Sequence, residues 1–558
     1  MVRNLIGLFN KEVRAVHHAA YILAASALVS QLLALFRDRV FASTFGVGKE
    51  LDLYYAAFRI PDMLFIAVSA LISVSVLVPM LVEAQKRGEK DQEELIKTIF
   101  TAFFWMVLIL ALAAFFVAPL ILPLLFPAYG DMMPELVAMT RLLLLSPILL
   151  GISNIFSSII QTSQRFIITA LSPILYNLGI ICGAVFLAGR HGIIGAVWGV
   201  AIGAFLHAAI QLPYLIKQKK VPGLSRENPF VILRKSASVI RASLPRTLSL
   251  SISELVEFTF VIVAGYLVVG SITVFNLAWN LQSVSLSLIG MSFSVALFPT
   301  LTRLFSEQNN DVFREKFIFT LRQVIFFGLL ASALCIVLRA QIVRTALGAG
   351  AFDWNATRLT AAAFALFTTS LVLQSLSLVM TRTWYARGST KIPLLSNLLG
   401  GFTSFAVLGI LMILWNKVPA IENFLEHLLR VEGEYGSDVL MLPIAFSIGA
   451  AVTACSLLLS LRKVMKGYLR SLVRPVCEHL LGAFVAGAVA YTVLQLFADS
   501  VDTTRVLGVF LHGAVAGVTG IVGAFAILLA IGNLEARHVL DGITRKKPAV
   551  VISENEPV

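Results

Sequence analysis

The stretch TIFTAFFWMVLILALAAFFVAPLILPLL (98–125) decides the fold class, because it is apolar and uncharged from end to end. A helix needs about 20 mainly apolar residues to cross the hydrocarbon core of a bilayer. The whole chain has the same character, since 58% of its residues are hydrophobic and 13% are charged, whereas soluble domains are about a quarter charged. The sequence therefore predicts an all-α protein embedded in a membrane.

Similar apolar runs recur along the chain and predict about fourteen transmembrane helices. Because this number is even, both termini should lie on the same side of the membrane. The expected spans lie near 16–36, 52–82, 98–125, 136–161, 167–189, 193–216, 242–268, 271–302, 317–338, 357–381, 391–415, 439–461, 476–498 and 505–532.

Basic residues indicate which side that is. If the N-terminus is cytoplasmic, the inside segments hold roughly 32 of the 44 lysines and arginines, an excess typical of cytoplasmic loops. The outside loops PAYGDMMPE (127–135) and VEGEYGSD (431–438) are neutral or acidic. We therefore expect both termini in the cytoplasm, the first span to be retained, and the net charge of +13 to face anionic lipid, with no nucleic-acid partner.

The sequence contains no motif of an enzyme. It lacks a phosphate-binding GxxxxGK[ST] loop, HExxH and CxxC, and its cysteines (Cys182, Cys335, Cys455 and Cys477) have no metal-type spacing. We predict no catalysis, cofactor or metal. Energy for transport would come from ion gradients, the membrane potential, or the supply and removal of the substrate.

The chain resembles itself weakly at an offset of 220 residues. LSPILYNLG (171–179) matches KIPLLSNLLG (391–400), and VPMLVE (78–83) matches FPTLTR (298–303). These matches pair Pro79 with Pro299, Pro173 with Pro393 and Asn177 with Asn397; we assign packing or conformational roles to the last four.

A repeat of about six spans preserves orientation, so the two repeats should be parallel and related by an axis along the membrane normal. The predicted domains are a six-helix lobe (1–216), a basic cytoplasmic linker (217–241), a second six-helix lobe (242–470), an appended helix pair (471–535) and a cytoplasmic tail (536–558).

Most of the charge inside the membrane lies in LLALFRDRVFASTFGVGKELDLYYAAFRIPDML (32–64). Each unpaired charge there costs several kcal/mol, so it must face water, a partner or a ligand. Snorkelling and internal pairing explain Arg39 and Asp62 equally well. Arg37, flanked by long apolar sequence, favours a cavity.

The seventh span carries two carboxylates, Glu254 and Glu257, near one face of a helix. At this depth a carboxylate either couples a cation or proton to transport or balances a buried arginine. Glu257 lies 220 residues after Arg37, so the repeat would allow these two residues to face each other.

Several of these segments together resemble a known family. FRDRVFASTFGVGKELDLYYAAFRIPDML (36–64), QLPYLIK (211–217), LPRTLSL (244–250), ALFPTLTRLFSEQN (296–309) and WYARGSTKIPLLSN (384–397) are similar, in order, to the MurJ (MviN) lipid II flippases of the multidrug/oligosaccharidyl-lipid/polysaccharide exporter superfamily.

The resemblance implies a flippase of the bacterial cytoplasmic membrane that moves a polyprenyl-pyrophosphate-linked cell-wall precursor, most often lipid II for peptidoglycan, by alternating access. It implies a cationic cavity and a groove on the appended helices for the lipid tail. Arg37 and Asp38 match the family's cavity pair on the first helix, and Asp52 matches the acidic position that opens the second. Arg59 and Asn280 complete the candidate substrate-binding set.

The chain departs from the family where Gln31, Phe65, Ile66 and Asn280 replace arginines. Fewer arginines weaken pyrophosphate binding, because charge-assisted bidentate contacts are the strong ones; Arg59, Arg246 or Arg382 are the candidate substitutes.

These departures leave alternatives open: an exporter of another lipid-linked oligosaccharide, a cation-coupled drug extruder, or a transport-inactive scaffold for cell-wall synthesis proteins. Coupling to the membrane potential, protons or sodium also stays open.

The topology can be tested with single cysteines at 225, 469 and 548, and at 130 and 433, labelled in intact cells with a membrane-impermeant reagent. We expect labelling of 130 and 433 only, because the basic segments should face the cytoplasm. Labelling of 225 from outside would overturn the orientation.

Overall fold

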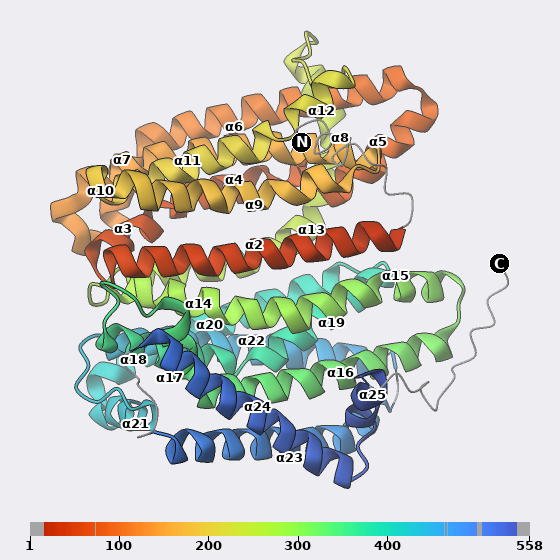
Figure 1. Ribbon diagram of the computed structural model, residues 1–558. Helices are drawn as coiled ribbons and strands as arrows, with labels where there is room; N and C mark the ends of the chain where they lie inside the picture. Colours follow the sequence, from red (N-terminus) through yellow and green to blue (C-terminus); the bar gives the residue numbers. More distant parts are fainter. Residues whose placement is uncertain (1–15, 73, 463, 466, 499–504, 544–558) are drawn as a thin grey trace, which may run out of the picture. The chain divides into compact units, whose positions relative to one another are not determined.

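The computed structural model describes residues 16–72, 74–462, 464–465, 467–498 and 505–543. Within these residues all regular structure is helical (Figure 1), which confirms the all-α prediction. The first half of the chain contains α2 (Val16–Phe45), α3 (Lys49–Ala57), α4 (Arg59–Ile72), α5 (Val74–Arg87), α6 (Glu89–Leu125), η1 (Pro127–Met132), α7 (Met133–Leu143), α8 (Leu145–Thr162), α9 (Phe166–Cys182), η2 (Gly183–Leu187), α10 (Ala188–His191), α11 (Ile193–Ala209), α12 (Leu212–Lys217) and α13 (Pro229–Ala264).

The second half continues in the same manner. Its helices are α14 (Ser271–Leu286), η3 (Ser287–Met291), α15 (Ser292–Ser306), α16 (Asn310–Val337), α17 (Arg339–Leu347), α18 (Trp354–Thr368), α19 (Leu371–Ala386), α20 (Lys391–Lys417), α21 (Pro419–Leu429), η4 (Ser437–Leu440), α22 (Met441–Arg462), α23 (Tyr468–Leu496), α24 (Val506–Ala530) and α25 (Leu534–Ile543).

Ten helices or joined helices in the described residues are long and apolar enough to cross a membrane, or eleven if the bent pair α18 and α19 is one span. These coincide with eleven of the expected spans, but the count of fourteen is not confirmed. The three other expected spans are helical as well and fall on α2, on α3 to α5, and on α13. These three segments carry the charged residues discussed above.

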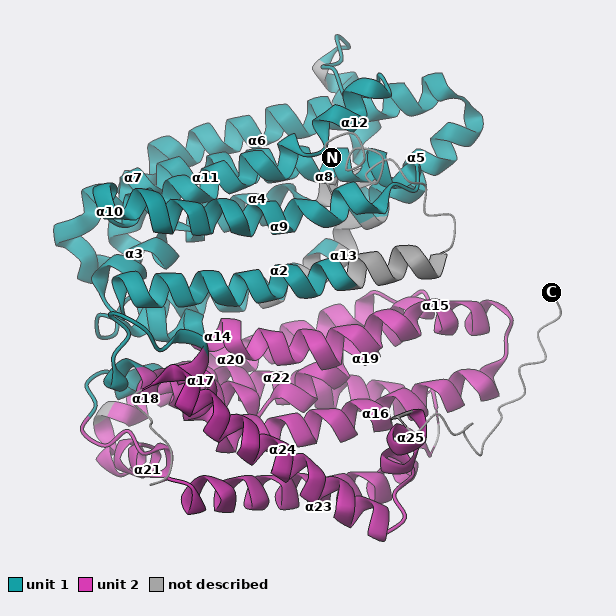
Figure 2. Cartoon of the chain, viewed as in Figure 1, with its two compact units in different colours: residues 1–277, 346–356, 434–439 teal, residues 278–345, 357–433, 440–558 magenta. Residues whose placement is uncertain are grey.

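The chain divides into two compact units (Figure 2). One comprises Met1–Leu277, Ala346–Ala356 and Glu434–Val439, and the other comprises Ala278–Thr345, Thr357–Gly433 and Leu440–Val558. The seventh span, α13, therefore belongs to the first unit, where it packs against α4 and α6. The predicted lobes instead began the second half at 242, and their parallel superposition stays a prediction.

Close packing of small residues builds the first unit. Gly195, Gly199 and Gly203, whose spacing indicates close helix approach, lie on α11. Gly199 and Gly203 face α9, and Gly195 faces the end of η2 and the start of α10. A Cβ on Gly199 would lie 2.8 Å from the Cα of Gly183, and a Cβ on Gly179 would lie 2.4 Å from the Cα of Gly203. No larger side chain fits unless the backbones move apart, so the glycines set the distance between these helices.

The second unit contains a comparable pair, α20 and α22. A Cβ on Gly400 would lie 2.7 Å from the carbonyl oxygen of Gly449, and a Cβ on Gly449 would lie 2.6 Å from that of Gly400. Asn177 and Asn397, paired by the predicted repeat, lie on α9 and α20, the first helix of each tight pair. Pro79 and Pro299, the other pair of the predicted repeat, both lie inside a helix, α5 and α15 respectively.

The predicted basic linker is shorter than expected. Helix α13 begins at Pro229, where the side chain of Asn228 accepts a hydrogen bond from the amide of Phe230 and caps the helix. The segment 229–241 is therefore helical, and only residues 218–228 connect α12 to α13 without a helix. Hydropathy does not reveal this helix start, because hydropathy is low in the charged first part of α13.

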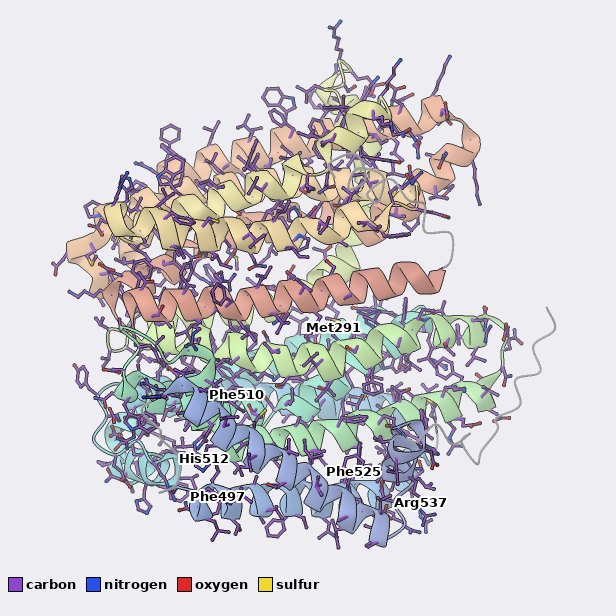
Figure 3. All side chains as sticks on the ribbon, in the orientation of Figure 1. Met291, Phe497, Phe510, His512, Phe525 and Arg537 are labelled. Carbon is purple, nitrogen blue, oxygen red and sulfur yellow. The ribbon has the colours of Figure 1, made fainter. Side chains whose placement is uncertain are left out.

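The appended helices α23 and α24 pack together along their length, and α25 follows them (Figure 3). Glu535 at the start of α25 accepts a hydrogen bond of 2.6 Å from Nε of Arg322 on α16, and its other oxygen lies 3.3 Å from Nε2 of His479 on α23. Burial alone would raise the pKa of Glu535, but these hydrogen bonds lower it to about 2. The carboxylate is thus charged at neutral pH and fastens α25 to two other helices.

Candidate functional site

Arg37 lies on α2 and is held by two neighbours. Its Nε and Nη2 donate to Oδ1 of Asp38 over 3.0 and 2.7 Å, and its Nη1 donates to Oδ1 of Asn177 on α9 over 3.4 Å. The Arg37 side chain is 20% exposed, whereas that of Asp38 is 3% exposed. Three of the predicted site residues therefore form one contact group, and the longest of its bonds is the one to Asn177.

The resemblance names Arg37 and Asp38 as a pair, and the structure shows them in contact, although successive helical residues point about 100° apart. Asp38 does not satisfy the whole guanidinium, since Nη1 bonds Asn177. The arginine side chain is long enough to bend back along the helix, and two of its nitrogens reach the same carboxylate oxygen.

Asp52 is fully buried, and its carboxylate is satisfied by the protein. Tyr129 donates its hydroxyl over 2.6 Å, Gly270 donates its amide, and Thr273 donates both its amide (2.7 Å) and its hydroxyl (2.6 Å). These contacts join α3 to η1 and to the first turn of α14. A carboxylate is favourable at a helix N-terminus, where amides lack partners. The geometry favours a structural role for Asp52, and its predicted contact with substrate stays a prediction.

Arg59 is buried at the start of α4 and links three elements. Its Nη1 lies 3.5 Å from Oε1 of Glu257 on α13, its Nη2 lies 3.6 Å from Oδ2 of Asp62, and its Nε donates to the carbonyl of Tyr55. Glu257 therefore balances Arg59, not Arg37 as the repeat suggested. Residues equivalent by duplication occupy matching places in two lobes, and this equivalence alone does not bring them into contact.

Glu254 lies one turn before Glu257 on α13 and is exposed. It is close enough to interact electrostatically with Glu257, Asp62 and Arg59. This acidic group thus contains three carboxyl groups around one arginine. Since its formal charge is −2 when every member is ionised, the arrangement favours the uptake of a proton or cation.

The remaining predicted residues lie on α9, α14, α19 and α20. Asn280 is half-buried on α14, Pro393 is buried and Asn397 half-buried on α20, and Pro173 is exposed on α9, where its carbonyl accepts a hydrogen bond from Asn177 of the Arg37 group. Arg382 is half-buried on α19, and its Nη2 lies 3.4 Å from the sulfur of Met291. The Arg246 side chain falls outside the described residues.

A polar network that hydropathy does not reveal joins α8, α9, α11 and the turn after α11. Ser153 bonds Nδ1 of His207 on α11 over 2.7 Å, and Gln211, in the turn between α11 and α12, donates to Ser153 and, over 3.2 Å, to Ser172. Uncharged polar residues in an apolar run do not lower its hydropathy enough to stand out. The one sequence signal is the four-residue spacing of His207 and Gln211, which the structure uses for a bond from Gln211 to the carbonyl of His207.

The comparisons with known proteins agree on one family. The model of the lipid II flippase MurJ family matches residues 41–510. The lipid II flippase MurJ of Burkholderia cenocepacia is 26% identical over 375 residues, covering 66% of this chain and 72% of that protein. The probable lipid II flippase MurJ of Thermotoga maritima is 23% identical over 468 residues, covering 82% and 92%.

Solved structures show the same fold. A lipid II flippase MurJ in an inward closed conformation aligns with a TM-score of 0.72 at 20% identity, covering 93% of this chain and 100% of that one. An inward-facing multidrug resistance MATE family transporter of the MOP superfamily aligns with a TM-score of 0.62 at 15% identity, covering 81% and 99%.

The family model covers most of the chain. Its match begins at residue 41, so it includes the resembling segments except residues 36–40, which contain Arg37 and Asp38. The protein belongs to the lipid II flippase MurJ family.

Proposed function

We propose that this protein moves lipid II across the bacterial inner membrane by alternating access. The observation that carries the proposal is the family match over residues 41–510. The relatives named above are described as lipid II flippases or probable ones. None of these comparisons favours export of another lipid-linked glycan. The proposal also places both termini in the cytoplasm, on the basis of the distribution of basic residues.

We propose that Arg37 binds the pyrophosphate group of the substrate. Asp38 fixes one edge of its guanidinium, while Asn177 holds Nη1 by a bond of 3.4 Å, which is long for a hydrogen bond between nitrogen and oxygen. A phosphate oxygen offers Nη1 a shorter, charge-assisted contact. The substrate would thus displace Asn177 and leave Asp38 in place, so that the arginine stays oriented and partly neutralised.

Arg37→Lys should lower lipid II transport about tenfold and Arg37→Ala should abolish it. The lysine keeps the charge but loses the planar fork, and hydrogen bonds to charged groups contribute about 1.5–3 kcal/mol. Transport is measured as flipping of lipid II in vesicles reconstituted with each variant.

Arg39→Lys is the matched control for this test. It changes an arginine two positions along the same helix, whose Nη1 bonds the carbonyl of Ala346 over 3.5 Å, and it should leave transport near the wild-type rate. Normal flipping by folded Arg37→Ala protein would remove Arg37 from the mechanism.

Glu254 and Glu257 are the residues we propose to couple an ion to transport. Glu257 and Asp62 already share Arg59, at 3.5 and 3.6 Å, and Glu254 adds a second excess negative charge to the group. A proton or sodium ion bound there would relieve this charge. Release of the ion would restore the repulsion between the carboxylates. It would shift the protein between its inward- and outward-facing conformations if these two conformations bind the ion with different affinity.

Glu254→Gln should remove the dependence of transport on the coupling ion while the protein stays folded. Glu257→Gln should in addition lower thermal stability, because it takes a partner from buried Arg59. The readouts are flipping in vesicles with imposed proton or sodium gradients, and the melting temperature.

Glu93→Gln serves as the control, since Glu93 is solvated and pairs with Lys97 on one exposed turn of α6. If the double variant Glu254→Gln/Glu257→Gln folds and transports at the wild-type rate under every gradient, both residues are structural.

A further inference from the structure

Helix α21 (Pro419–Leu429, PAIENFLEHLL) has an apolar face that the described chain covers only in part. Its apolar residues recur at helical spacing, and its polar residues occupy the opposite side. None of its side chains is buried, and Phe424 and Leu428, one turn apart, are 65% and 59% exposed. The apolar face comprises Ile421, Phe424, Leu425, Leu428 and Leu429, and the polar face comprises Glu422, Asn423, Glu426 and His427.

The rest of its unit holds α21 by its C-terminal end. Arg339 at the start of α17 donates to the carbonyl of Leu429 over 3.3 Å, and Nε of Arg358 on α18 donates to the carbonyl of Arg430 over 3.0 Å. Cations are favourable at this end of a helix. The next residue, Val431, is fully buried. These contacts hold α21 through its backbone. Ile421, Leu425 and Leu429 are half-buried, whereas Phe424 and Leu428 stay exposed.

The position of α21 along the chain identifies what lies against that face. It begins two residues after the end of α20, whose stretch Lys391–Trp415 is long and apolar enough to cross the membrane. Phe402, Ile410 and Ile413 of α20 are exposed in the same way and in a membrane would contact lipid. The uncovered face of α21 therefore continues a lipid-facing surface at the point where the chain leaves the bilayer.

We propose that α21 lies in the plane of the membrane surface, with Phe424 and Leu428 inserted among the lipid acyl chains. The occupant of the apolar face is the bilayer itself, at the boundary between head groups and acyl chains where amphipathic helices bind. Because α21 contains no lysine or arginine, its attachment rests on apolar burial. It should not depend on anionic lipid or on salt, unlike that of basic interfacial helices.

Nitroxide labels on α21 test this proposal in the full-length protein. Single cysteines replace Phe424 and Leu428 on the apolar face, and Asn423 and Glu426 as matched controls on the polar face. The four native cysteines are replaced by alanine, and the parent protein is required to retain its melting temperature. The protein is placed in nanodiscs of phosphatidylethanolamine and phosphatidylglycerol, and collision rates with oxygen and with a water-soluble nickel chelate are measured by electron paramagnetic resonance.

We expect the ratio of oxygen to nickel collisions to be several-fold higher at 424 and 428 than at 423 and 426. The ratio should be unchanged in high salt and in nanodiscs without phosphatidylglycerol. Frequent nickel collisions at 424 and 428 would place the face in water, and protection from both reagents would place it against protein. Either result would overturn the proposal. So would a fall in the ratio of oxygen to nickel collisions at 424 and 428 in high salt.

Discussion

Charges at membrane depth must be neutralised within the chain, and this constraint organises the first unit. Arg59 is balanced by Glu257 and Asp62, Arg37 by Asp38, and Asp52 by hydrogen bonds from Tyr129, Gly270 and Thr273. Removing one partner of a buried pair costs about 3–5 kcal/mol, because the other charge remains without compensation. The contacts between elements link α4 to α13 through Glu257, α2 to α9 through Asn177, and α3 to η1 and the first turn of α14.

The same constraint explains how a paired site can serve transport. A charged residue that is fully paired in one conformation can exchange one weak hydrogen bond for a contact with substrate. Its charge then stays neutralised throughout. In the proposed mechanism, substrate would replace the 3.4 Å bond from Arg37 to Asn177, and an ion would offset the excess negative charge of the acidic group. The Asp52 contacts offer no such exchange, since its carboxylate is buried and satisfied from several sides.

The sequence predicted the fold class and the charged segments, because hydropathy and charge act residue by residue. It allowed a carboxylate on the seventh span to balance a buried arginine but did not identify which arginine. The repeat would allow Glu257 to face Arg37, whereas helix packing brings it to Arg59. The direction of Asp38 on the helix does not show that the Arg37 side chain can bend back to it. The network of Ser153, His207 and Gln211 escaped notice because uncharged polar residues leave little trace in hydropathy.

The central claim is that this chain is a working lipid II flippase although Gln31, Phe65, Ile66 and Asn280 stand where arginines were expected. Its most direct test is to express the chain in a bacterium depleted of its own lipid II flippase, and to measure growth together with the fraction of lipid II accessible outside the inner membrane. The account predicts sustained growth and normal accessibility of lipid II. Lysis, with lipid II retained on the cytoplasmic side despite normal expression and membrane insertion of the protein, would contradict it.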